Sequence, residues 1–144
     1  MLEDWFVAAP TLTRLRSGPT GPFVEGFAQF LRAAGYVRGS VLRYLRAAAH
    51  LGTWMHAHSV VTAMLDERTL EAFTAHLPGC ACLRRNRGIY RDARAGVRLF
   101  LAHLRDRGMA PPAQRSCALP DVVEQFEHWM RSHRGVTAST LRIY

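Results

Sequence analysis

The chain has 144 residues, of which 49% are hydrophobic and 21% charged, a composition typical of a globular protein with one hydrophobic core. It has no run of about 20 apolar residues that could cross a membrane, and its acidic start, Met1–Trp5, lacks the features of a signal peptide. We therefore expect a cytoplasmic protein. The formal net charge of +8 indicates a polyanionic partner, and nucleic acid is the first candidate.

The basic residues are all of one kind, because all 19 are arginine and the chain has no lysine. Coding bias explains the choice of arginine over lysine, but it does not explain why basic residues outnumber the 11 acidic ones. Three cysteines, Cys80, Cys82 and Cys117, do not make a disulfide framework and indicate thiols in a reducing compartment.

The N-terminal half predicts an arm and two helices. Residues 1–21 contain two prolines and two glycines with little periodicity, so we expect an N-terminal arm with at most a short helical turn. A helix is predicted from Pro22 to Ala34, with Gly35 ending it in a left-handed conformation. A second helix, capped by Ser40, is predicted to run to about Ala57.

Two more helices and a linker follow. Asp66 is a candidate N-cap for a third helix, which Pro78 and Gly79 end. A fourth helix follows a loop over residues 78–86 and is closed by Gly108. No segment alternates with period two, so the chain is predicted to be all-α. We expect a helical DNA-binding domain over residues 22–112 and a linker over 113–120.

A stretch near the N-terminus recurs in degenerate form at the other end of the sequence. Residues 24–32 align with 123–131 and, after an insertion at Arg134, residues 35–44 align with 135–144. This repeat predicts that residues 121–144 are the first helices of a second, truncated unit of the same type.

The predicted fourth helix has a basic face. At about 100° per residue, five arginines fall within a sector of roughly 60°, and apolar residues fill the opposite half. The five are Arg87, Arg91, Arg94, Arg98 and Arg105, and Arg84 and Arg85 extend the charge into the preceding loop. Guanidinium groups in such an array suit phosphate groups, although an ordinary solvated helix face is the alternative.

The predicted second helix is basic on one side as well. Arg43, Arg46 and His50 share a face that follows Arg38 in the turn. Trp54 lies on the same side, where we expect it to pack against a neighbouring helix, with contact to a DNA sugar as the alternative.

Three motifs together resemble one family. They are F-L-R-A-A-G-Y-x-x-x-[ST]-V-x-x-Y-L from Phe30, A-F-T-A-H-L from Ala72 and V-R-L-F-L-A-H-L-R-D-R-G from Val97. In order and spacing they resemble the N-terminal core-binding, SAM-like domain of tyrosine recombinases, the phage integrase family. The resemblance implies a four-helix bundle that clamps one face of duplex DNA during recombination and integration, near the nucleoid and beside other recombinase protomers.

The resemblance implies contacts to DNA but no chemistry. The implied DNA-binding residues are Arg38, Arg43 and Arg46 on the second helix and Arg87, Arg91, Arg94 and Arg98 on the fourth, with Arg84 and Arg85 added by charge. The catalytic domain of the family needs a lysine, and this chain has none. The H-x-x-R match at His128–Arg131, followed by Tyr144, is explained by the repeat, in which Trp129 is expected to be a core position. We therefore expect no catalytic residues and no enzyme activity of the chain by itself.

Other site types find little support in the sequence. His76, Cys80 and Cys82 offer three zinc ligands, but the C-x-C spacing is tight and a fourth ligand is not evident. We therefore expect no bound metal, no cofactor and no small-molecule substrate. Two alternatives to the recombinase module stay open, namely a stand-alone helical DNA-binding regulator and a remnant protein whose charge is only compositional.

Overall fold

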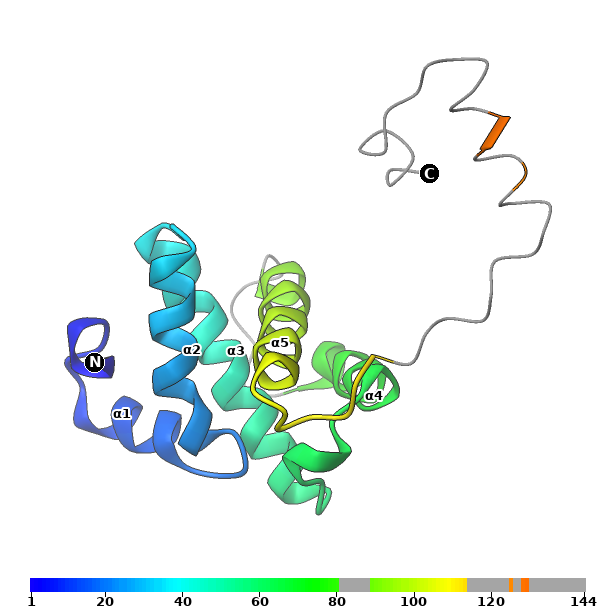
Figure 1. Ribbon diagram of the computed structural model, residues 1–144. Helices are drawn as coiled ribbons and strands as arrows, with labels where there is room; N and C mark the ends of the chain where they lie inside the picture. The colour runs from blue at the N-terminus through cyan, green and yellow to red at the C-terminus, as the bar shows by residue number, and fades with distance from the viewer. Residues whose placement is uncertain (81–88, 114–124, 126–127, 130–144) are drawn as a thin grey trace. The chain divides into compact units, whose positions relative to one another are not determined.

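The computed structural model of the chain describes residues 1–80 and 89–113, together with positions 125, 128 and 129. The chain divides into two compact units, Met1–Ala113 and Gln114–Tyr144. The α-helices of the first unit are α1 (Ala9–Arg16), α2 (Gly21–Ala33), α3 (Arg38–Ala57), α4 (Glu67–His76) and α5 (Ile89–Asp106), shown in Figure 1. Short 3₁₀ helices are η1 (Leu2–Asp4), η2 (Thr62–Met64) and η3 (Leu77–Gly79).

The described ranges contain helices and no strand, so the predicted all-α class is confirmed. Whether the helices have the SAM-like arrangement stays a prediction. Of the helices in these ranges, none combines the length and the apolar character that a membrane span needs.

Three predicted helix ends are confirmed by their local geometry. The Asp66 carboxylate accepts a hydrogen bond of 2.8 Å from the Thr69 amide and so caps α4. Gly35 and Gly108 have φ angles of 78° and 69°, which are the left-handed conformations expected after α2 and α5.

The predicted cap of α3 is wrong. The helix begins at Arg38, because the Val37 carbonyl already accepts hydrogen bonds from the amides of Ser40 and Val41. Ser40 therefore lies inside the first turn, where its hydroxyl accepts a hydrogen bond of 3.2 Å from the Arg43 guanidinium.

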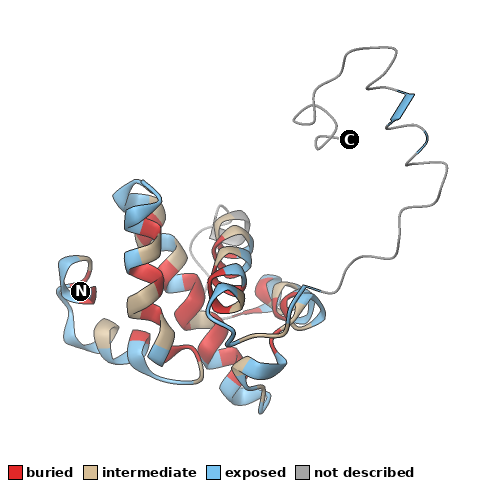
Figure 2. Ribbon diagram, in the orientation of Figure 1, coloured by how far each residue is buried: buried red, intermediate tan, exposed pale blue. Residues whose placement is uncertain are grey.

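Helix α3 is central to the first unit and contacts α1, α2 and α5. Buried residues follow the inward sides of α2, α3 and α5, and exposed residues follow the outward sides (Figure 2). Phe27 of α2 and Phe100 of α5 meet edge to face at 5.1 Å between ring centroids, and both are fully buried. The core is therefore built by the apolar stripes that the sequence places on these helices.

Two glycines allow close approach to α3. A Cβ atom on Gly96 of α5 would lie 3.0 Å from the Tyr44 Cα atom of α3. A Cβ atom on Gly52 of α3 would overlap the Thr20 side chain, which is buried just before α2. The small residues thus fix how near the neighbouring segments come to α3.

The N-terminal residues, predicted to form an arm, are part of the helical body instead. Leu2, Phe6 and Leu15 are 0%, 6% and 1% exposed, and α1 packs against α2 and α3. The sequence does not indicate this packing, because the core residues lie in different elements and residues 7–10 between them are exposed.

In the second unit the described residues are Gln125, His128 and Trp129, which are helical. Trp129, predicted as a core position of the repeat, is 44% exposed. Its counterpart Phe30 in α2 is itself only partly buried, so this repeat position lies at the edge of the apolar stripe. The linker positions 114–120, Arg131 and Tyr144 lie outside the described residues.

Candidate nucleic-acid interface

The arginines at the two ends of the predicted basic face of α3 contact the N-terminal segment. Arg38 donates a hydrogen bond of 3.0 Å to the Asp4 carbonyl, and its guanidinium carbon lies 5.4 Å from the Trp5 ring centroid. The guanidinium carbon of Arg46 lies 5.5 Å from the ring centroid of Phe6. Cation–π contacts of this kind stabilise a fold by about 0.5–1 kcal/mol at exposed sites. Both side chains thus hold the N-terminal segment on α3.

Arg43, between them, joins α3 to α5. Its Nε atom lies 3.0 Å from the Asp92 carboxylate, with side-chain exposures of 50% for Arg43 and 33% for Asp92. Ion pairs this exposed are screened by solvent and contribute at most about 1 kcal/mol. All three predicted DNA-binding arginines of α3 are exposed, and all three also have partners within the protein.

The outer face of α5 carries two exposed arginines. Arg94 and Arg98 are exposed one turn apart, while Ala93, Val97 and Leu101 on the same helix are buried. Within the described residues, neither arginine forms an ion pair. Arg91 belongs to α5 with its side chain outside the description, and Arg84, Arg85 and Arg87 lie outside the described residues.

The basic face of α5 ends before Arg105, which the sequence had placed on it. The Arg105 guanidinium donates two hydrogen bonds, of 2.6 and 2.8 Å, to the Glu67 carboxylate of α4. Its Nε atom donates a third, of 2.7 Å, to the Pro111 carbonyl, and the side chain is only 17% exposed. The hydrogen bonds from Arg105 lower the pKa of Glu67 to about 2. Arg105 therefore fastens α4 and the segment after α5 to the body.

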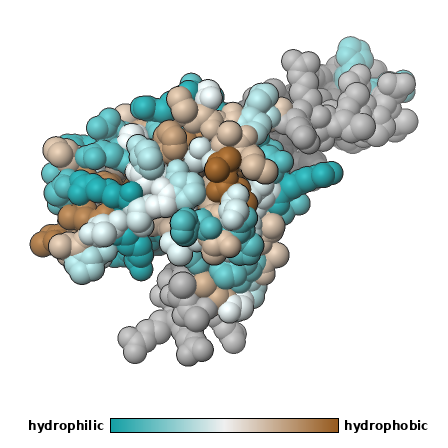
Figure 3. All heavy atoms as spheres, turned by 90° about the horizontal axis from the view of Figure 1, so that it is seen from below, coloured by the Kyte–Doolittle hydropathy of each residue, from teal (hydrophilic) through white to brown (hydrophobic). Residues whose placement is uncertain are grey.

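A groove of about 450 Å³ runs between α4 and α5. Glu67 and Glu71 line it from α4, and Arg94 and Arg98 line it from α5. The basic face of α5 thus has acidic neighbours on the side of α4. On the molecular face in Figure 3, hydrophobic residues form small separate patches among hydrophilic ones.

Trp54 packs inside the protein, as predicted. It is 9% exposed and meets Phe73 of α4 edge to face at 5.8 Å. The packing interpretation of this residue is therefore confirmed for the described part of the chain.

His50, predicted on the basic face of α3, is half-buried near two other possible metal ligands. Its Nε2 atom lies 3.3 Å from the Cys80 sulfur, and the His76 ring centroid is 5.7 Å from its own. Burial lowers the pKa of His50, and the nearby His76 and Arg14 lower it further. The sequence had grouped His76 and Cys80 with Cys82, which lies outside the described residues. It gave no signal for His50, because α3 and α4 meet only in the fold.

The chain was compared with protein-family models, with curated proteins and with solved structures, and none of them matches it.

Proposed function

We propose that the first unit binds duplex DNA through the outer face of α5, as the N-terminal DNA-clamping module of a tyrosine recombinase does. The observation that carries this proposal is the pair Arg94 and Arg98, which are exposed one turn apart and form no ion pair within the described ranges. The tyrosine recombinase assignment rests on the sequence resemblance alone.

The charge of the first unit supports a polyanionic partner. Met1–Ala113 contains fifteen of the arginines against eight acidic residues, so the surplus belongs to the helical body. One turn of helix separates Arg94 from Arg98 by about 6 Å along the axis. Each guanidinium can donate two parallel hydrogen bonds to one phosphate group, so two phosphates of a backbone can be held at once.

The arginines of α3 are secondary candidates for contacts with DNA phosphates. Their cationic groups stay exposed while they hold Trp5, Phe6 and Asp92. Because phosphate must compete with these partners, we expect each of them to add less to DNA affinity than Arg94 or Arg98.

Duplex DNA binding tests the proposal. We expect the logarithm of the association constant to fall with the logarithm of salt concentration with a slope of roughly −3 to −6, for four to six phosphate contacts. The variant Arg94→Glu/Arg98→Glu should lose at least tenfold in affinity and should reduce the steepness of this slope by about 2.

The matched control reverses the same number of charges elsewhere. Arg32 of α2 and Arg68 of α4 are both exposed and lie outside the predicted DNA-binding set. Arg32→Glu/Arg68→Glu should therefore weaken binding much less than the α5 variant. Equal losses in the two variants would mean that only net charge matters, and no binding at low salt would refute the function itself.

A further inference from the structure

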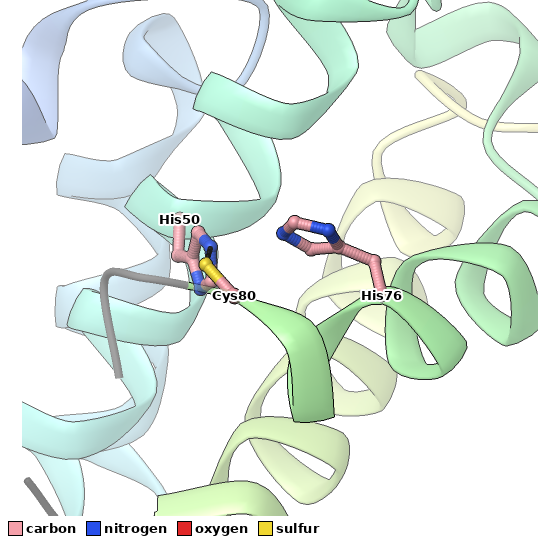
Figure 4. Close-up of side chains that lie close together, drawn as sticks. All are labelled: His50, His76 and Cys80. Atoms are coloured by element: carbon pink, nitrogen blue, oxygen red, sulfur yellow. Dashed lines mark hydrogen bonds between the residues drawn. The ribbon is translucent and has the colours of Figure 1, made fainter. Parts of the chain in front are cut away.

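Three side chains with metal-binding atoms converge between α3 and the end of α4. His50 comes from α3, His76 is the last residue of α4, and Cys80 directly follows η3. In Figure 4 the imidazole of His76 points across the space toward His50 and the Cys80 sulfur. Two nitrogen donors and one sulfur donor from three separate segments therefore lie close together.

The spacing of these donor atoms suits a tetrahedral ion. The three atoms lie within 4.8 Å of one another, and the Cys80 sulfur is 3.3 Å from Nε2 of His50. With zinc–sulfur and zinc–nitrogen bonds of about 2.3 and 2.0 Å, a tetrahedral sulfur and nitrogen are about 3.5 Å apart. One pair is thus already near ligand spacing, and the third donor atom lies within 4.8 Å of both.

The local backbone favours a chelating pair. His76 and Cys80 are separated by three residues, within the two to four typical of paired zinc ligands. The η3 turn folds the chain back between them, and the Cys80 amide donates a hydrogen bond of 3.2 Å to the Leu77 carbonyl. His50 then supplies the distant ligand from α3, where its neighbours Ala49 and Leu51 are buried.

The donors are partly shielded from water, since Cys80 is buried and both histidines are half-buried. Cys80 is 8% exposed, and the Phe73 ring lies 5.2 Å from His50 and 6.3 Å from His76. An apolar wall around a histidine–cysteine set is typical of sites for borderline-soft ions.

We propose that His50, His76 and Cys80 bind one zinc-class divalent ion. Two imidazoles and one thiolate fill three tetrahedral positions, and water fills the fourth. Binding forms the metal–sulfur bond and releases the thiol proton to solvent. The ion would link the end of α4 to the middle of α3, and this inference does not depend on DNA binding.

The competing explanation is a metal-free core cluster. In that case the Cys80 thiol donates a hydrogen bond to His50, and the rings of His50, Phe73 and His76 simply pack together. The two explanations differ in one measurable property, because only the first predicts stoichiometric metal binding through sulfur.

The test uses the full chain, kept reduced and stripped of metal with a chelator, and Co²⁺ as a spectroscopic probe. We expect saturation at one Co²⁺ per chain, with a sulfur-to-cobalt charge-transfer band in the near ultraviolet and tetrahedral bands in the visible range. Zn²⁺ should displace the cobalt and raise the melting temperature of the chain.

Two variants locate the ligands. Cys80→Ser should abolish the charge-transfer band, and His50→Gln should weaken Co²⁺ binding at least tenfold. Cys80→Ser keeps a group that can hydrogen-bond to His50, so it preserves the fold, which circular dichroism checks. The matched controls His56→Gln, an exposed histidine on the same helix, and Cys117→Ser should bind as the parent chain does.

Three results would overturn the proposal. They are the absence of saturable binding, a charge-transfer band that survives Cys80→Ser, and equal weakening by His50→Gln and His56→Gln. If His50→Gln does not fold, the cysteine variant alone decides, because the band reports the sulfur ligand directly.

Discussion

At the scale of single residues, His103 of α5 is a buried polar side chain at an apolar contact between helices. It is 4% exposed, and its ring lies 5.7 Å from Phe27 and 5.4 Å from Phe30 of α2. Its Nε2 atom is buried without a hydrogen-bond partner among the described residues. A buried polar atom left in this state costs about 1–3 kcal/mol.

We predict that His103 makes the fold sensitive to mild acid. Burial lowers the pKa of His103, Arg107 lowers it further, and Asp106 partly opposes the shift. As pH falls below the ordinary histidine value, the unfolded chain takes up a proton that the folded chain refuses. The free energy of unfolding should therefore be highest above that value and fall as pH drops toward the folded pKa. Chemical denaturation between pH 7.5 and pH 5 measures this slope.

The variant His103→Phe should reduce the slope and, at pH 7.5, raise the free energy of unfolding by about 1 kcal/mol. Part of the slope should remain, because burial also lowers the pKa of His50. The exposed His56 provides the control, since His56→Gln should leave the profile unchanged. An unchanged slope in His103→Phe would show that His103 is hydrated or protonated in the folded state.

At the scale of elements, Gly52 allows the residues just before α2 to pack closely against α3. An alanine Cβ there would overlap the buried Thr20 side chain. We predict that Gly52→Ala lowers the free energy of unfolding by about 1–3 kcal/mol through overpacking, despite the better helix propensity of alanine. Thermal or chemical denaturation measures the loss, and adding Thr20→Ala should restore part of it.

The matched control for this substitution is Gly26→Ala in α2. Its Cβ would meet only the flexible end of the Arg107 side chain, at 3.4 Å. Alanine should therefore raise the free energy of unfolding by up to about 1 kcal/mol, because helix propensity is the main change. Equal effects of the two glycine variants would mean that the contact at Gly52 does not limit how closely these segments pack.

Elements were predictable where a local signal exists. The Asp66 cap and the left-handed Gly35 and Gly108 are set by a few neighbouring residues, and all three were correct. Ser40 failed as a cap, because the backbone can begin a helix without a side-chain cap and local sequence does not fix the first residue. The sites depend on contacts between distant elements, such as Arg105 with Glu67 and His50 with Cys80, and helical periodicity carries no signal for these.

At the scale of the whole molecule, the N-terminal segment changes the role of the basic surface. Arg38 and Arg46 were predicted to point at DNA, yet they hold Trp5 and Phe6 of a segment expected to be an arm. The all-α class followed from periodicity, whereas the docking of α1 and η1 is a tertiary contact with few apolar residues in each element. The exposed arginines of α3 therefore have partners within the protein, whereas Arg94 and Arg98 of α5 form no ion pair among the described residues.

Two substitutions test whether the N-terminal segment is docked on the helical body. Leu15 of α1 is 1% exposed, whereas Val7, between η1 and α1, is 97% exposed. If the segment belongs to the body, Leu15→Ala should lower the free energy of unfolding by about 2–4 kcal/mol, because it leaves a cavity in the core. Val7→Ala shortens a side chain that lies in solvent and should change the free energy of unfolding by less than about 0.5 kcal/mol. Chemical denaturation compares the two variants. A Leu15→Ala effect as small as that of Val7→Ala would favour the predicted N-terminal arm over a docked segment. If Leu15→Ala detaches the N-terminal segment from α3, the cation–π contacts of Arg38 with Trp5 and of Arg46 with Phe6 should be lost as well. Both guanidinium groups would then become available to phosphate.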